Sequence, residues 1–223
     1  MPPNATATRD QLIAAAEVLF AERGIGAVSL REINSAAGQR NSSALQYHFG
    51  DRLGLVRAVL AKHDPEVHTR RHQLLDAYEV AGHPVEPSPI ERRAAVRDLA
   101  GALVRPLAAK LADAGGGRAY LQISAELINR SDFVDSGRRD RRDSIHRWRS
   151  LVGPLLPEVA VRRLHHRFTA IRITYVELAR RAGGPVKRDE RLFTAHLVDV
   201  VTAILDAELS AETTRLLDER STR

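Results

Sequence analysis

Apolar residues recur along most of this chain at spacings of three and four, which is the period of an amphipathic α-helix. The first such segment begins at Thr8, whose hydroxyl we expect to cap the helix, and ends at Gly24. The apolar face of this predicted helix is formed by Leu12, Ile13, Ala16, Leu19 and Phe20. The chain therefore opens with a helix that can bury one face.

A second and a third helix are predicted on either side of a tight turn. The second begins with a capping-box pattern, Ser29 followed by Glu32, and ends before Gly38. Asn41 or Ser42 can cap the short polar helix that follows. Two short helices across a glycine turn form a helix-turn-helix, whose second helix enters the DNA major groove. An ordinary helical hairpin would show the same turn, so this pattern alone leaves both readings open.

The remaining segments are also helical by period. Asp51 caps a fourth helix, and Pro65 is expected to end or kink it. Further helices are predicted around 67–78, 89–111, 120–128, 161–183 and 193–205. A loop is predicted at 82–89 and a frayed polar tail after 210. The pattern predicts an all-α protein.

Composition narrows the class of protein. Hydrophobic residues make up 43% of 223 positions, the formal charge is +6, and there is no cysteine. These values favour a folded core and a polyanionic partner, and they exclude disulfides and thiolate metal sites. The N-terminus lacks a signal-peptide pattern, and no apolar run reaches the roughly 18 to 20 residues of a membrane span. We expect a cytoplasmic protein without a membrane partner.

Catalytic and metal-binding patterns are weak. His68 and His72 lie four residues apart on a predicted helix, a spacing that can place two imidazoles on one metal ion. No carboxylate or thiol completes the set locally, so a solvent-facing pair is the favoured interpretation. No phosphate loop or nucleophile motif is present. We expect no enzyme activity, no cofactor and no metal.

Four aromatic residues in the second half of the chain are candidates for a small-molecule pocket between helices. They are Tyr120, Trp148, Phe168 and Tyr175. Ordinary core packing is the alternative for each of them, and the sequence does not decide between the two.

A set of short motifs in the first sixty residues carries a family resemblance. The motifs, in order, are Leu19-Phe20-Ala21-Glu22-Arg23-Gly24, Ser29-Leu30-Arg31-Glu32-Ile33, Ala36-Ala37-Gly38 and Tyr47-His48-Phe49-Gly50-Asp51-Arg52. Residues 9–60 thereby resemble the DNA-binding domain of the TetR family of transcriptional regulators. Two features depart from the family pattern: the spacing from Gly38 to Phe49 is one residue longer, and Gln46 stands where a tyrosine is usual.

The resemblance implies a division at 63/64. Residues 1–63 would form a three-helix helix-turn-helix domain, and residues 64–223 a helical domain for ligand binding and dimerisation. The DNA-contacting candidates are Ser29, Arg31, Gln39, Arg40, Asn41, Ser43, Gln46, Tyr47, His48 and Arg52. The dimer candidates are the apolar stripe Phe193, Leu197, Val200, Val201 and Ile204.

The implied function is a homodimeric regulator of transcription, a repressor rather than an activator. It would bind double-stranded DNA at a palindromic operator and be released by a small-molecule effector. The alternative is a helical DNA-binding or interaction protein that responds to no effector.

Overall fold

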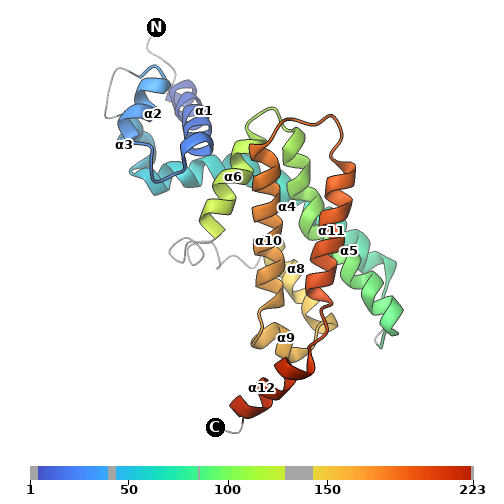
Figure 1. Ribbon diagram of the computed structural model, residues 1–223. Helices are drawn as coiled ribbons and strands as arrows, with labels where there is room; N and C mark the ends of the chain where they lie inside the picture. The colour runs from blue at the N-terminus through green and yellow to red at the C-terminus, as the bar shows by residue number, and fades with distance from the viewer. Residues whose placement is uncertain (1–4, 40–43, 85, 129–142, 222–223) are drawn as a thin grey trace.

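The computed structural model describes residues 5–39, 44–84, 86–128 and 143–221, which form helices and connecting turns without a strand (Figure 1). A small N-terminal head is built from the first three helices and the start of the fourth. Their bounds are α1 (Ala5–Arg23), α2 (Leu30–Ala36), α3 (Ala44–Phe49) and α4 (Arg52–Ala81). The all-α prediction is confirmed.

Local capping signals place the helices of the head. Ser29 and Glu32 form the expected capping box, with the Glu32 amide donating to Ser29 Oγ at 3.2 Å. Gly38 follows α2 with a φ of +68°, a conformation that a side chain disfavours. Asp51 caps α4 by accepting the Gly54 amide at 2.7 Å. The predicted cap at Thr8 is wrong, because α1 already begins at Ala5 and Thr8 is buried within it.

The fourth helix is longer than the sequence predicted. It continues for 30 residues through Pro65, which neither ends it nor separates it from the segment that contains Val67 and Tyr78. Both halves of α4 bury apolar residues, Val56 and Val59 in the head and Val67 and Leu75 in the body. This burial on both sides offsets the backbone hydrogen bond that a helix-interior proline removes.

The larger body packs around a second apolar core. Its elements are α5 (Pro89–Ala108), η1 (Ala109–Ala112), α6 (Gly117–Ile128), α8 (Ser144–Val152), η2 (Gly153–Leu155), α9 (Glu158–Arg162), α10 (His166–Gly183), α11 (Arg191–Leu205) and α12 (Ala211–Ser221). The helices α10 and α11 lie side by side against α5 and α6 (Figure 1). Ile123 and Leu127 of α6 reach into the core of the head, so the two cores are joined through this helix.

Two predictions for the body are wrong. The single helix expected from Val161 to Gly183 is interrupted, because His165 adopts a φ of +56° between α9 and α10. The tail after Ser210 is the helix α12 and not a frayed end, and its first turn is held by the Thr213 amide donating to Ser210 Oγ at 3.2 Å. The charged stretch that precedes Asp143 lies outside the described residues.

Candidate DNA-binding surface and ligand cavity

The helix α3 lies at the outer edge of the head, away from the body (Figure 1). Leu45 anchors it in the core with 1% of its surface exposed, whereas Gln46 and Tyr47 face outward. Tyr47 is 84% exposed and makes an edge-to-face contact with the half-buried His48 ring. An exposed aromatic ring and an amide on one short helix can meet base edges and phosphates.

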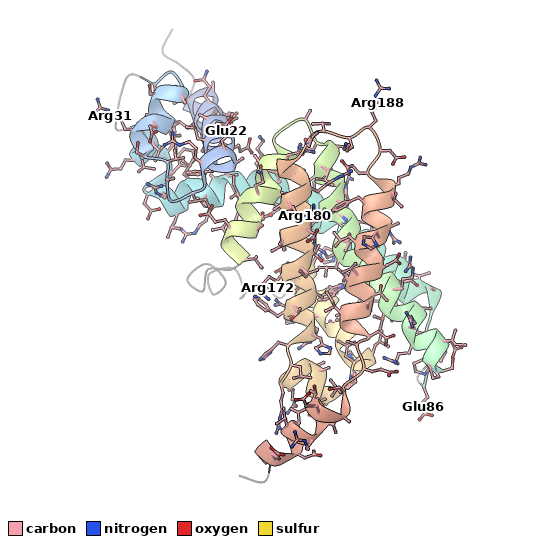
Figure 2. All side chains as sticks on the ribbon, viewed as in Figure 1. Glu22, Arg31, Glu86, Arg172, Arg180 and Arg188 are labelled. Atoms are coloured by element: carbon pink, nitrogen blue, oxygen red, sulfur yellow. The ribbon has the colours of Figure 1, made fainter. Side chains whose placement is uncertain are left out.

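The other DNA-contacting candidates differ in how available they are. Arg31 is exposed at the outer edge of the head (Figure 2). Ser29 is occupied by the capping box, and the Gln39 amide donates to Gln11 Oε1 at 3.1 Å. Arg52 Nη1 donates to the carbonyls of Ile25 and Val28, so this side chain holds the loop between α1 and α2. Arg40, Asn41 and Ser43 lie outside the described residues.

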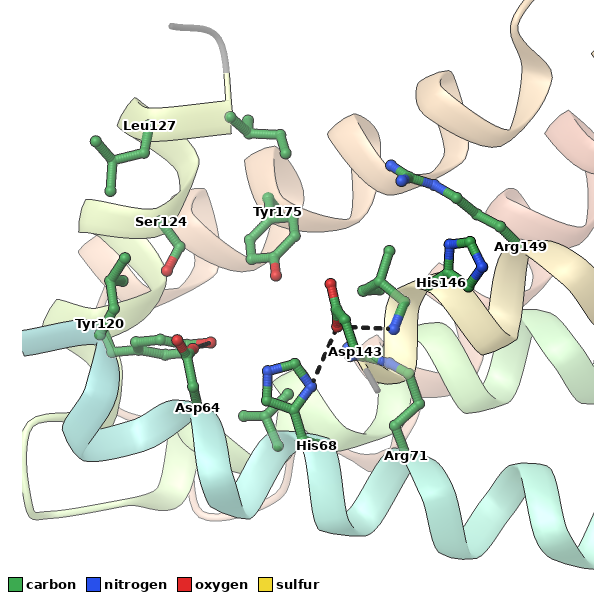
Figure 3. A pocket seen from close by; sticks show the side chains of 14 residues that line it. Asp64, His68, Arg71, Tyr120, Ser124, Leu127, Asp143, His146, Arg149 and Tyr175 are labelled. Carbon is green, nitrogen blue, oxygen red and sulfur yellow. Dashed lines mark hydrogen bonds and ion pairs between the residues drawn. The ribbon is translucent and has the colours of Figure 1, made fainter. Parts of the chain in front are cut away.

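A cavity of about 240 Å³ lies in the body, between α4, α6, α8 and α10 (Figure 3). Its apolar wall is made by Leu60, Val67, Leu127, Ile128 and Ile145. Its polar lining includes Asp64, His68, Arg71, Ser124, Asp143, His146, Arg149 and Tyr175. A concave apolar site with a few polar groups is the usual form of a small-molecule site.

The four aromatic candidates separate into two classes. Tyr120 and Tyr175 line the cavity. Trp148 is fully buried in the core of the body, where its indole nitrogen donates to the Leu99 carbonyl at 2.8 Å. Phe168 is half-buried in α10 and does not line this cavity.

The polar lining residues were missed by the sequence reasoning. Asp64, Val67, His68 and Arg71 occupy positions 0, 3, 4 and 7 of α4, which lie on one helical face. That spacing was the available signal, but the expectation that Pro65 would end or kink the helix hid it. Asp143 also belongs to the cavity, where it accepts the Ile145 amide and lies 3.4 Å from His68 Nδ1.

Burial changes the chemistry of the carboxyl group at one end of the cavity. Tyr120 donates its hydroxyl to Asp64 Oδ1 at 2.9 Å. Burial raises the pKa of Asp64 above its ordinary value, although the Tyr120 hydrogen bond acts in the opposite direction. Burial likewise raises the pKa of Tyr120 well above its ordinary value. Asp64 is thus more readily neutral than an exposed carboxyl.

A contact chain runs from the cavity to the first helix of the head. The Tyr120 ring packs on His63 with 5.0 Å between ring centroids, and His63 Nε2 lies 2.8 Å from Glu17 Oε1. Lys62 donates to the other Glu17 oxygen at 2.7 Å. Glu17 and His63 are almost completely buried, so these groups join α1 to α4 beside the cavity wall.

Neither a metal site nor a membrane span is seen in the described ranges. His68 faces Ser144, and His72 faces Arg147, so the two imidazoles do not converge. No group of three or more suitable side chains in these ranges could hold a metal ion. No helix there is both long and apolar enough to cross a membrane.

The predicted dimer stripe on α11 divides between two environments. Leu197 and Val201 fill the core of the chain itself, which leaves neither available to a partner. Phe193, Val200 and Ile204 are half-buried. Exposed apolar residues of the same two helices are Leu192 of α11, which is 84% exposed, and Val176 of α10.

Comparison with known proteins supplies independent information on both halves of the chain. Residues 12–59 match the family described as "Bacterial regulatory proteins, tetR family". The fold is similar to the crystal structure of Mycobacterium smegmatis AmtR, with 21% sequence identity and a TM-score of 0.54. That similarity covers 100% of this chain and 97% of the other. No curated protein resembles the chain closely enough to count as a match.

Proposed function

We propose, from the match of residues 12–59 to the TetR family of bacterial regulatory proteins, that this chain is a ligand-responsive repressor that binds a palindromic operator as a homodimer. The observation that carries the proposal is the head itself. Its α3 buries Leu45 and presents Gln46 and Tyr47 outward, as a reading helix in a helix-turn-helix must. We propose that Arg31 adds a phosphate contact.

The homodimer provides a second reading head. One such helix contacts few base pairs, so useful affinity needs two heads about one helical turn of DNA apart. The apolar residues that α10 and α11 leave exposed or half-buried, which include Val176, Leu192 and Val200, are proposed to join two copies. The division at 63/64 falls inside the continuous helix α4, which would carry movement from body to head.

The effector acts by shifting a conformational equilibrium. A molecule in the cavity would press on Tyr120 and Asp64, which connect through His63 to Glu17 of α1. DNA favours one spacing of the heads and the effector another, and the coupling is reciprocal. The cavity favours this function over a DNA-binding protein without an effector.

Selection of duplexes from a random pool by the purified protein tests the DNA-binding proposal. We expect a palindromic site with half-sites about one helical turn apart. Gln46→Ala should relax sequence preference by about 1 to 3 kcal/mol at one position, whereas Tyr47→Ala should weaken all sequences alike. Val80→Ala, at an exposed position far along α4, is the control. Failure to enrich any sequence would refute the proposal.

A thermal-shift screen against small molecules tests the effector. A ligand that binds the native protein raises its melting temperature, and a true effector must also lower operator affinity. Binding without any change in operator affinity would favour the effector-free alternative.

A further inference from the structure

The guanidinium of Arg71 is buried at the cavity without a complete set of partners. Arg71 is 1% exposed, and its Nη1 donates to Ser144 Oγ at 2.8 Å. Among the described residues, its Nε and Nη2 have no hydrogen-bond partner, and no carboxylate lies within ion-pair distance of its guanidinium. Burial lowers the pKa of Arg71, but an arginine remains charged at neutral pH because its ordinary value is so high.

A buried charge without a partner is costly, so this site gains from any ligand that supplies one. The unpartnered atoms, Nε and Nη2, form one edge of the planar guanidinium. Their two N–H groups are parallel and match the two oxygens of a carboxylate. We propose that the cavity binds a small monocarboxylate whose charged group pairs with this edge of Arg71. The inference rests on the proposed effector function and names the chemical class of the effector.

Two carboxyl groups of the cavity, Asp64 and Asp143, favour a ligand with a single negative charge, while the basic side chains Arg149 and His146 also line the cavity and favour an anion. Asp143 is held by His68 and by the Ile145 amide, and Asp64 is held by Tyr120 (Figure 3). A phosphate carries about 1.5 to 2 negative charges and would meet both carboxyl groups. A carboxylate brings one charge, and the pKa of Asp64 is raised by burial, which reduces the repulsion at that end.

The size and the wall of the cavity define the rest of the molecule. At about 240 Å³ it lies below the roughly 300 to 1,000 Å³ of typical ligand pockets, so the ligand is small. Leu127, Ile128 and Val67 offer apolar surface, and the Tyr175 ring stands opposite α4 (Figure 3). A short aliphatic chain or a single aromatic ring fits this wall.

Binding of matched acids and amides to the full chain tests the proposal. The probes are benzoate, phenylacetate and hexanoate, each compared with its primary amide by calorimetry at neutral pH. We expect at least one acid to bind about tenfold or more tightly than its amide, because a hydrogen-bonded charge pair is lost in the amide. Equal binding of acids and amides, or tighter binding of inorganic phosphate, overturns the proposal. This comparison needs no variant.

Variants then assign the effect to Arg71. Arg71→Met should abolish the preference for the acid while leaving the melting temperature of the free protein unchanged or higher, since an unpaired buried charge is removed. Arg71→Lys keeps the charge but loses the parallel pair, and it should lose most of the preference. Arg70→Met, one residue along α4 with an exposed ion pair to Glu66, is the matched control and should bind as the wild type does.

Two results separate this inference from the function on which it rests. Arg71→Met should still select the same operator, because Arg71 lies in the body and not in the head. A wild-type protein that binds operator but prefers no acid overturns only the ligand class. An Arg71→Met protein that keeps the preference for the acid, or that melts several degrees lower, shows that Arg71 is structural and also overturns it.

Discussion

The surroundings of each aromatic side chain determine whether it can be replaced without loss of the fold. Trp148 and Tyr175 are equivalent in the sequence pattern, yet one is sealed in the core and the other lines the cavity. The difference arises from the neighbouring helices. Trp148 finds the Leu99 carbonyl of α5 as a hydrogen-bond acceptor, and periodicity along one helix does not show such a partner.

Substitution of these two residues should therefore have different results. Trp148→Ala is expected to lower the free energy of unfolding by about 3 to 5 kcal/mol, because it opens a large cavity. Tyr175→Phe removes one hydroxyl at the cavity and should cost less than about 1.5 kcal/mol while altering ligand binding. Denaturant unfolding monitored by circular dichroism measures both. Similar losses for the two variants would contradict this assignment.

The capping box at the start of α2 gives a prediction for pH dependence. Hydrogen bonds from the Ser29 side chain and amide, followed by the contact with Arg23, lower the pKa of Glu32 from its ordinary value of 4.5 to about 2. A carboxyl group whose pKa is lowered in the folded state contributes its full stabilisation when the pH is above the pKa of the unfolded chain. This contribution is lost as the pH falls towards the folded-state pKa of about 2.

Glu32→Gln should accordingly melt at a lower temperature than the wild type near neutral pH. The difference between the two melting temperatures should narrow as the pH falls from about 5 towards 2. Glu22→Gln is the control, because Glu22 is exposed on the neighbouring helix α1 (Figure 2). A difference that stays constant over this range would show that the charge of Glu32 has no part in the cap.

Elements were predicted well where the signals are local and poorly where packing overrides them. Ser29, Gly38 and Asp51 act through atoms within three or four residues, and the structure has each of them as expected. Pro65 also gives a strong local signal, but its helix is held by burial at both ends. The break at His165 requires a positive φ in a residue other than glycine, for which the sequence pattern gives no sign.

The candidate sites were likewise predicted where they depend on local signals and missed where they depend on packing between distant segments. Gln46 and Tyr47 were candidates from the sequence and are exposed in the structure, and their contact with DNA stays a prediction. The cavity unites side chains from four helices that are remote in sequence, so only the two tyrosines were anticipated. Arg52 was a DNA-contacting candidate from the sequence, yet its contacts with loop carbonyls depend on how α1, α2 and α4 meet.

The junction between α1, α4 and the loop before α6 gives a prediction at the scale of elements. Glu17 is 3% exposed and lies between Lys62 and His63. Gly116 approaches it with a φ of +103°, and a Cβ atom there would lie 2.5 Å from Glu17 Oε2. The loop, the head and α4 are therefore packed together at one carboxylate.

Glu17→Gln should lower the free energy of unfolding by about 1.5 to 3 kcal/mol. The loss stays below that of a fully buried ion pair because Lys62 is 40% exposed. Gly116→Ala should destabilise as well, since it strains the backbone and displaces Glu17. In a double-mutant cycle, the loss of unfolding free energy in the double mutant should be smaller than the sum of the two single losses, because both substitutions act on the same carboxylate. Strict additivity would indicate that Gly116 and Glu17 are independent.

At the scale of the whole molecule, some residues of α11 are expected to support folding of the chain and others to support assembly of the dimer. Leu197 and Val200 lie three residues apart, and the first is buried in the core while the second is half-buried. A two-fold interface contains each residue twice, so a charge placed in it is buried twice without a partner. The same charge in the core instead prevents the chain from folding.

Val200→Glu should therefore sediment as a monomer, keep its helical circular dichroism and lose affinity for a palindromic operator. Leu197→Glu should lose helical signal and DNA binding together, because its carboxylate has no access to water in the folded chain. The double-stranded probe should carry both half-sites, since a single head retains contact with only one of them. Arg172→Glu, at an exposed polar position of α10, controls for added negative charge on the body. If Val200→Glu remains a dimer with unchanged operator affinity, the interface is formed by a different face of the body, and the spacing of the two heads is set by that face instead.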